Sequence, residues 1–340
     1  MKVYKGSHYG KMVGGMSDQD LLLSVIVPVY NVEDYLEENL ESLTHQTRGG
    51  YELIFVNDGS TDRSPEIIRH YQDSYPFIRL VDKENGGISS ARNAGIAEAR
   101  GKYLGFIDSD DFVKEDYVER MLERAEAEDS DIVICDLLTW FGENDERNYT
   151  MKGLNPDRPE LPNGRRLFLS PLFAWNKIYK RSFFLAQNIL YEEGTWYEDL
   201  EVTLYLSARA EKISYEEKTL ICYRQRNNSI MSSRNQKCLD IFPVLEKIYK
   251  RFEREGLLEE YHDELEYLFI ENLFIYGGFR LLALENYQEV FQKADSFITK
   301  YFPDHRKNPY IKHLPLKYRV FMNMRYPFFL PLFRKYLLRK

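Results

Sequence analysis

The sequence predicts an α/β fold, with a mostly parallel central sheet followed by a C-terminal helical region. Up to about residue 140, apolar β-branched runs alternate with helical patterns, as in strand–helix–strand units of a parallel sheet. After about residue 235 only the helical spacing of apolar residues remains. The 340 residues, 44% of them hydrophobic, are enough for about two domains with a large core, which excludes general disorder.

The predicted strands are short apolar runs that end in turn residues. They cover 21–30, 51–60, 77–82, 102–111 and 131–138. Continuous apolar runs of this kind fit strands that are buried on both faces of a parallel sheet. The intervening helices are expected over 34–46, 62–75, 89–100 and 112–127, with Asp62 as an N-cap.

The middle of the chain is more mixed. Prolines mark a surface loop over 144–164, and the aromatic segment 166–184 is expected to pack against the sheet. A helix is expected over 198–210, and a short strand over 219–226. The C-terminal helices are expected over 238–254, 257–279 and 284–300.

The cysteines and the N-terminus indicate a cytoplasmic protein. Cys135, Cys222 and Cys238 have no CxxC spacing, which argues against a disulfide framework and a zinc site and favours buried free thiols. Residues 1–20 contain no apolar signal segment and are expected to form a flexible tail. No apolar run approaches the ~18–20 residues of a membrane-spanning helix.

The net charge of -8 hides an asymmetry. Residues 305–340 carry ten Lys and Arg and no Asp or Glu, whereas the remainder carries 36 basic and 54 acidic residues. The acidic body argues against nucleic-acid binding. The basic tail also contains eight large aromatic residues, among them Tyr326. Peripheral docking on an anionic membrane, packing on the helical region and a contact in a homo-oligomer are the three explanations.

Chemically useful side chains gather where the predicted strands end. Pro28 and Tyr30 end the first strand and Asp58 the second. Asp108 and Asp110 end the fourth, and Arg92 follows the glycine loop after the third. Ligands of open α/β sheets bind at this edge. An aromatic wall, carboxylates for Mg²⁺ or Mn²⁺ and an arginine suit a nucleoside diphosphate. Neither GxGxxG nor GxxxxGK[ST] is present, which argues against a dinucleotide-binding Rossmann domain and a P-loop.

These motifs together resemble the family 2 glycosyltransferases, which have the GT-A fold. The matching segments are SVIVPVYN (24–31), FVNDGSTD (55–62), NGGISSARNAG (85–95) and FIDSDD (106–111). WNKIYKRSFF (175–184) and WYEDLEV (196–202) resemble the acceptor half of bacterial capsule and cell-surface glycan members. The resemblance implies a catalytic domain over 21–234, with a nucleotide-binding half (21–138) and an acceptor half (139–234). The helical region then covers 235–340.

The resemblance also implies roles for the residues at the strand ends. Pro28 and Tyr30 flank the base, Asp58 binds the base imide, and Arg92 lies near the base or the diphosphate. Asp108 and Asp110 form the DXD element, with Asp108 toward the ribose and the metal and Asp110 on the metal, Mn²⁺ or Mg²⁺.

The catalytic base implied by the resemblance is Asp199. Glu198 and Asp199 open a helix, where the helix dipole favours an ionised carboxylate, so Glu198 is the rival for this role. The donor loop around 224–234 has no histidine. Arg224, Arg226 or Arg234 could contact the diphosphate there, and the sequence does not decide between them.

The resemblance therefore predicts an inverting, non-processive transferase, because the QxxRW element and membrane helices of processive members are missing. It moves one sugar from a nucleotide-diphosphate sugar, expected to be a UDP-sugar, to a hydroxyl of a glycan or lipid-linked acceptor. The protein is expected to be cytoplasmic and to work at the inner face of the plasma membrane. The alternatives are a sugar-phosphate nucleotidyltransferase, whose N-terminal glycine-rich signature is missing here, and a non-catalytic nucleotide-sugar-binding protein.

Overall fold

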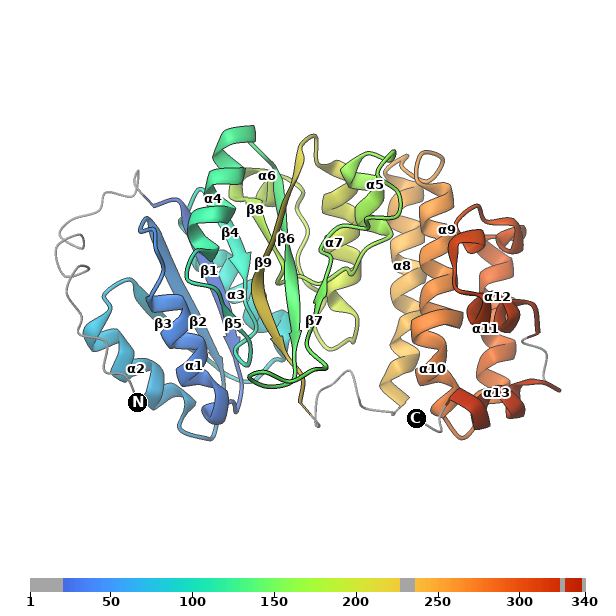
Figure 1. Cartoon of the computed structure of the whole chain (residues 1–340), viewed down its shortest axis with the longest axis horizontal. Helices are drawn as coiled ribbons and strands as arrows, with labels where there is room; N and C mark the ends of the chain where they lie inside the picture. The colour runs from blue at the N-terminus through green and yellow to red at the C-terminus, as the bar shows by residue number, and fades with distance from the viewer. Residues whose placement is uncertain (1–20, 227–235, 325–327, 338–340) are drawn as a thin grey trace. The chain divides into compact units, whose positions relative to one another are not determined.

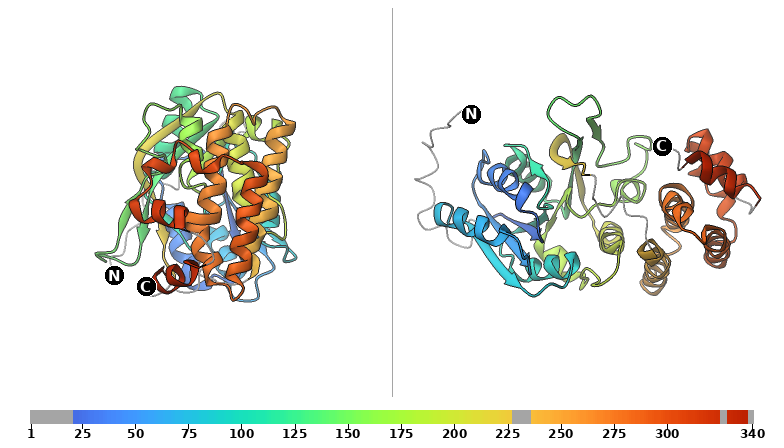
Figure 2. Two further views of the ribbon diagram at one scale, coloured as in Figure 1. Left: turned by 90° about the vertical axis from the view of Figure 1, so that its right-hand side faces the viewer. Right: turned by 90° about the horizontal axis from the view of Figure 1, so that it is seen from below.

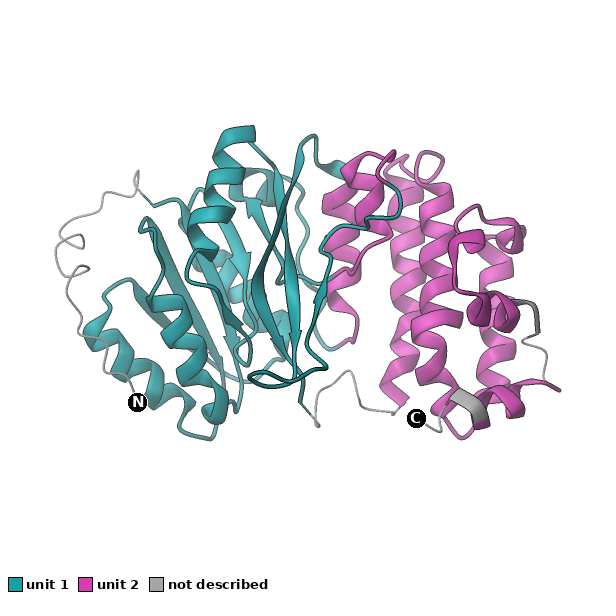
Figure 3. Cartoon of the chain, in the orientation of Figure 1, with its two compact units in different colours: residues 1–158, 173–194, 209–226 teal, residues 159–172, 195–208, 227–340 magenta. Residues whose placement is uncertain are grey.

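The chain folds into two compact units, each assembled from separate stretches of sequence (Figure 3). The computed structural model describes residues 21–226, 236–324 and 328–337. Unit 1 consists of the described residues up to 158 together with 173–194 and 209–226. Unit 2 consists of 159–172, 195–208 and the described residues from 236 onward. Two segments of the expected catalytic domain therefore pack with the C-terminal helices.

Unit 1 is built on a nine-stranded sheet in the order β3-β2-β1-β4-β8-β6-β9-β5, with β7 paired to β6 (Figure 1). The strands are β1 (Leu23–Val29), β2 (Tyr51–Asp58), β3 (Ile78–Lys83), β4 (Tyr103–Phe106), β5 (Phe112–Val113), β6 (Ile132–Trp140), β7 (Tyr149–Met151), β8 (Lys177–Lys180) and β9 (Ile213–Arg224). The four strands β3, β2, β1 and β4 are parallel, as the buried apolar runs predict. Their carboxyl ends therefore meet at one edge of the sheet.

The strand β8 corrects one expectation. The aromatic segment 166–184 was expected to pack against the sheet, but its residues Lys177–Lys180 lie within it, antiparallel to β4 and to β6. A four-residue strand is too short for its periodicity to distinguish it from a helical turn. This antiparallel insertion makes the sheet mixed, while the longer ladders stay parallel.

Helices cover both faces of the parallel part of the sheet. Those of unit 1 are α1 (Glu33–Thr44), α2 (Ser64–Ser74), α3 (Ile88–Glu98), α4 (Tyr117–Glu128) and α6 (Arg181–Ala186). Figure 2 shows α1 and α2 against one face and α3 against the other, as right-handed crossovers in this strand order require. Asp62 accepts hydrogen bonds from the backbone N–H of Ser64 (3.0 Å) and of Glu33 (3.0 Å). It thus joins the starts of α1 and α2 rather than capping one helix.

The bend before β4 requires glycine at position 101. A Cβ atom there would lie 2.7 Å from the backbone nitrogen of Ser24 and 2.9 Å from the carbonyl oxygen of Tyr103. Because these atoms belong to the sheet backbone, they cannot turn aside as a side chain would. We expect Gly101→Ala to lower the free energy of unfolding by about 1–3 kcal/mol, measured by urea denaturation. Gly49→Ala is the control, since a Cβ at Gly49 meets nothing within 4 Å. Equal stability of the two variants would contradict the prediction.

Unit 2 is helical around a single apolar core. Its α-helices are α5 (Asn163–Phe168), α7 (Glu198–Arg209, which ends at the unit boundary), α8 (Ile241–Arg254), α9 (His262–Ile270), α10 (Tyr276–Ala283), α11 (Tyr287–Tyr301), α12 (Leu316–Met324) and α13 (Leu330–Leu337). A π-helical turn, η5 (Glu271–Ile275), separates α9 from α10, so the single helix expected over 257–279 is interrupted. Short 3-10 turns lie at Gln236–Asp240 (η4), His305–Lys307 (η6) and Ile311–His313 (η7).

The basic aromatic tail is divided between packing and exposure. Tyr310 is buried and its hydroxyl donates a 2.6 Å hydrogen bond to Glu264 Oε1. Phe321 and Phe333 also pack on the helical core. Phe328, in contrast, is 86% exposed, and Tyr326 lies outside the described residues. Among the described helices, none has the length and apolar character needed to cross a membrane.

Candidate functional site

An acidic loop follows β4 and is fixed from two sides. The side-chain amide of Asn39, on α1, donates hydrogen bonds to the carbonyl oxygens of Asp108 (3.2 Å) and Asp111 (2.9 Å). At the end of β9, the backbone N–H of Arg224 donates to Asp111 Oδ1 (2.8 Å), and its Nε donates to the carbonyl of Asp110 (2.8 Å). Asp111 is therefore a structural residue that ties the loop to β9. The carboxylates of Asp108 and Asp110 stay partly accessible, with 25% and 17% of their side chains exposed.

Negative charge accumulates at this loop. Burial, together with the neighbouring Asp108 carboxylate, raises the pKa of Asp110 above its ordinary value. Burial raises the pKa of Asp111 well above the ordinary value, with Asp110 and Asp108 adding to the shift. Arg92 donates to Asp108 Oδ1 (3.2 Å), and Arg226 forms an ion pair with Asp110. The arginines do not cancel the effect of burial and of Asp108, because the pKa of Asp110 stays raised. The loop therefore suits a further cation.

The Asp58 carboxylate lies in a cradle formed by the glycine loop. Oδ1 accepts hydrogen bonds from Lys83 Nζ (2.7 Å) and the Gly86 N–H (2.9 Å), and Oδ2 accepts from the Gly87 N–H (2.7 Å). Gly87 has a φ of 85°, which favours glycine. An ionised carboxylate has about four lone-pair sites, so Oδ2 retains one for an imide N–H. The sequence located this loop but did not reveal that it holds Asp58.

Pro28 and Tyr30 lie at the carboxyl end of β1. Pro28 is buried in β1 beside Val56 of β2, whereas Tyr30 follows the strand with 52% of its surface exposed. Asn31 has a φ of 48° and its side-chain oxygen accepts the Thr61 N–H (2.8 Å), which joins the loops after β1 and β2. Since β2, β1 and β4 are parallel neighbours, the structure brings Tyr30, Asp58 and the acidic loop to one edge.

The two described arginines after β9 differ in their surroundings. Arg224 is committed to Glu38 (2.5 Å), and its guanidinium lies over the Trp140 ring at 4.5 Å. Arg226 faces Asp110, with its guanidinium 5.1 Å from the centre of the Tyr35 ring. Arg226 is therefore the better placed of the two for a diphosphate, and Arg234 lies outside the described residues. The Tyr35 ring is close to both guanidinium groups, at 5.3 Å from Arg224, so their acidic partners distinguish them. Glu38 and Asp110 are distant in sequence from the arginines, which explains why the sequence left the choice open.

Three aromatic side chains form a cluster beside the acidic loop that the sequence did not predict. The rings of Phe173 and Trp175 stack at 4.7 Å, and Trp175 meets Tyr223 at 5.0 Å. Burial, with the charge of Asp111 as the next cause, raises the pKa of Tyr223 to about 12, which places this ring next to the loop. Because residues 173–175 lie in an irregular segment before β8, no strand or helix periodicity could have indicated this cluster.

Glu198 and Asp199 belong to unit 2, whereas the six predicted donor-side residues belong to unit 1. Both acids are half-buried in the first turn of α7. The preceding Tyr197 has a φ of 65°, an unfavourable conformation for an aromatic residue. Arg280 Nη1 donates to its hydroxyl (3.1 Å), and the Trp196 N–H donates to Asp240 Oδ2 (3.1 Å). Strained backbone that is held in this way is frequent at functional sites.

Comparison with known proteins agrees with this geometry. Residues 24–186 match the model of glycosyl transferase family 2. The uncharacterized glycosyltransferase EpsJ of Bacillus subtilis (strain 168) is 38% identical over 217 residues, which are 62% of this chain and 62% of EpsJ. The uncharacterized glycosyltransferase YibD of Escherichia coli (strain K12) is 32% identical over 265 residues, or 72% of this chain and 76% of YibD. This chain belongs to glycosyltransferase family 2.

The fold of this family 2 glycosyltransferase is also shared with a solved structure. S. aureus TarS 1-349, determined in complex with UDP-GlcNAc, matches with a TM-score of 0.65 and 22% identity over 92% of each chain. The predicted family and GT-A fold are therefore confirmed.

Proposed function

We propose that this glycosyltransferase is inverting and non-processive, and that it transfers one sugar from a UDP-sugar to a hydroxyl of a cell-surface glycan or glycoconjugate. This proposal rests mainly on one observation: Asp58, Arg92, Asp108 and Asp110 lie together at one edge of the sheet. Asp58 is the carboxylate that would bind the base, and the other three suit a diphosphate and its cation. The UDP-GlcNAc complex of TarS, which has the same fold, supports a uridine donor.

The acidic pair fits a divalent cation. Its oxygen donors are those that Mg²⁺ and Mn²⁺ prefer, and the raised pKa of Asp110 reflects negative charge that a cation would relieve. Among the described residues, no cluster of three or more His, Cys, Asp or Glu could hold a metal. Asp108 and Asp110 would therefore share the ion with the donor phosphates, a common arrangement for Mg²⁺. When bound, the cation would neutralise the leaving diphosphate.

The side chains of the chain divide the remaining work. Tyr30 packs on the base and Asp58 accepts its imide N–H, while Arg92 holds Asp108 in place. Asp199 accepts the proton of the acceptor hydroxyl. The acceptor oxygen then bonds to the anomeric carbon as the bond from that carbon to the diphosphate oxygen breaks. Because this is a single displacement, the configuration inverts and no protein nucleophile is needed.

The test is a panel of UDP-, GDP- and dTDP-sugars with Mn²⁺, in which release of free nucleoside diphosphate is measured. We expect release from a UDP-sugar, increased by the correct acceptor. Exchange of pyrophosphate into the donor would instead indicate a nucleotidyltransferase. Thermal stabilisation by a donor without any turnover, with acceptor extracts present, would indicate a binding protein.

Acid pH is expected to abolish the effect of Mn²⁺ on stability. A proton and the cation compete for Asp110, whose pKa burial raises in the free protein. Mn²⁺ should therefore raise the thermal midpoint at neutral pH by binding the folded state. As the pH falls, protonation of Asp110 should remove this increase in the thermal midpoint. The loss should occur at a higher pH than expected for an ordinary aspartate, whose pKa is 3.8. Asp110→Asn should show no increase at any pH, and a pH-independent increase in the wild type would refute the assignment.

We place the reaction in the cytoplasm, at the inner face of the plasma membrane. The three cysteines are buried and none is in a disulfide, which suits a reducing compartment. A lipid-linked acceptor would be met at the membrane surface.

A further inference from the structure

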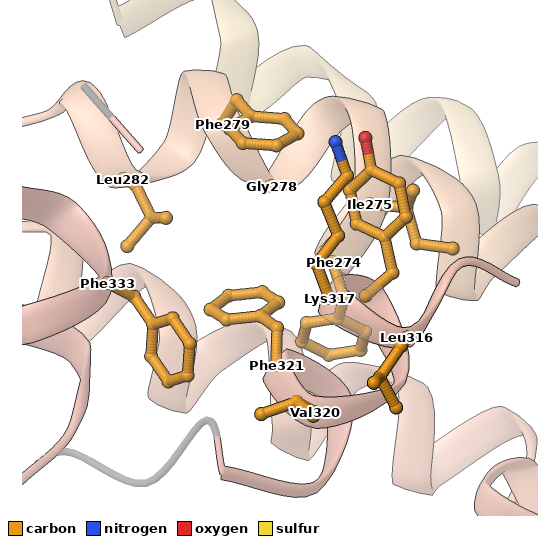
Figure 4. Close-up of a pocket in the computed structure, with 11 residues that line it drawn as sticks. Phe274, Ile275, Gly278, Phe279, Leu282, Leu316, Lys317, Val320, Phe321 and Phe333 are labelled. Atoms are coloured by element: carbon orange, nitrogen blue, oxygen red, sulfur yellow. The ribbon is translucent and has the colours of Figure 1, made fainter. Parts of the chain in front are cut away.

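Unit 2 contains an apolar cavity of about 360 Å³ (Figure 4). It lies between η5 and α10 on one side and α12 and α13 on the other. Lys317 is the one charged residue among its eleven lining residues. Pockets for small ligands are usually about 300–1,000 Å³ and mostly apolar, so this cavity has the size and lining of a ligand site.

The backbone keeps the cavity open. A Cβ atom at Gly277 would lie 1.7 Å from the carbonyl oxygen of Asn272, in the π-helical turn, so only glycine fits behind that turn. The next residue, Gly278, lines the cavity and presents no side chain to it. Two adjacent helical glycines disfavour a helix, and π-helical turns are frequent at functional sites. The two glycines therefore permit the close approach of the π-helical turn and α10 that forms this wall of the cavity.

The helices α12 and α13, which line one side of the cavity, and the residues next to them expose both apolar and positively charged groups. Leu316 and Val320, on α12, line the cavity and are 71% and 38% exposed. On the α13 side, Phe328 and Leu332 are 86% and 64% exposed. Cationic side chains on these two helices are exposed as well, namely Lys317, Arg319 and Lys335. No Asp or Glu lies between residues 305 and 340. Large exposed apolar groups beside an open apolar cavity are suited to contact with an apolar partner.

We propose that the cavity binds an acyl chain of an anionic membrane lipid, with α12 and α13 resting on the bilayer surface. The apolar lining would stay dry and would accept a hydrocarbon chain. The cations complement the negative headgroups, and the exposed Phe328 and Leu332 enter the boundary between headgroups and chains. Lys317 suits the entrance, because its stem lines the cavity and its ammonium lies 4.8 Å from the centre of the Tyr318 ring. The cavity is lined by residues of unit 2 and includes none of the predicted donor-side residues of unit 1, so this inference goes beyond the proposed function.

The first experiment measures binding of cis-parinaric acid, a fluorescent fatty acid, to the full chain. We expect saturable binding that drops at least tenfold in affinity in Leu282→Trp, which fills the cavity. Val320→Asp, which places a charge at the partly exposed entrance, should give the same loss without a core substitution. Leu185→Asp is the matched control, since Leu185 is 44% exposed on α6 of unit 1. Non-saturable binding, or wild-type affinity in folded Val320→Asp, would overturn the proposal.

The second experiment uses sedimentation with vesicles. Binding is expected to phosphatidylglycerol-containing vesicles at low salt, and not to pure phosphatidylcholine vesicles. Leu332→Asp should weaken vesicle binding at least tenfold but leave parinaric acid binding unchanged, because Leu332 does not line the cavity. A chain that stays in the supernatant at low salt would overturn the membrane assignment. A dimer that Val320→Asp dissociates would also overturn it, by showing that a second copy covers the entrance.

Discussion

Replacing Asp110 with asparagine is expected to reduce sugar transfer by about 10³-fold or more, while the protein stays folded. The amide keeps the shape of the side chain but removes the charge that would hold the cation against the diphosphate. Burial and Asp108 raise the pKa of Asp110, so its ionised form is unfavourable in the fold. The thermal midpoint at pH 7 should therefore not fall. The measurement is the initial rate of nucleoside diphosphate release, with the midpoint from calorimetry.

Asp129→Asn is the matched control, because the exposed Asp129 pairs with Lys180 (2.8 Å) before the start of β6, at the opposite edge of the sheet from the acidic loop. Its activity should equal that of the wild type. A chelator should reproduce the Asp110→Asn defect reversibly in the wild type. Full activity of the wild type in excess EDTA would contradict a metal role for Asp108 and Asp110.

Replacing Asp199 with asparagine is expected to lower kcat by about 10²–10⁴-fold, the usual contribution of a general base. The KM for the donor should change little, because this carboxylate acts on the acceptor hydroxyl. The asparagine keeps a polar group in the first turn of α7, so the helix should still form. The measurement is steady-state kinetics with donor and acceptor varied separately.

Glu198→Gln is the comparison that identifies the base. Both carboxylates are half-buried in the same helical turn, so burial does not separate them. If Asp199 is the base, Glu198→Gln should retain kcat within about tenfold, well short of the ~10²–10⁴-fold loss of a base. The opposite pattern would give the role to Glu198. Equal large losses in donor affinity would show that the pair supports the structure and not the chemistry.

The sequence could predict which residues meet at the carboxyl ends of the strands, because each of these residues directly follows its own strand. Each buried strand ends in its own polar residues, and the parallel order brings Tyr30, Asp58 and Asp108 together without further knowledge. What could not be predicted depends on partners far apart in the sequence. The cradle around Asp58 needs Lys83 and the glycine loop, and the surroundings of Arg226 need Tyr35 and Asp110, which come much earlier in the sequence.

The middle of the chain was harder to predict for a related reason. The strand β8 has four residues, too few for periodicity to reveal it, and it pairs with strands about 45 and 75 residues earlier. The same holds for α7, whose apolar face has a helical pattern that does not say which core it joins. Strand and helix types were predictable from local spacing, but membership of a unit was not.

The packing of α7 limits how genes of this family can be recombined. Leu200 and Leu204 are buried in the core of the C-terminal helices. Glu201 is held by Arg251 (2.6 Å) and by Lys247 (2.8 Å), both on α8. A chimera that exchanges only the sequence after residue 235 would pair α7 with foreign C-terminal helices and lose these contacts. Productive exchanges should carry residues 159–172 and 195–208 together with the C-terminal region, so that α7, which bears Asp199, keeps the helices on which it packs.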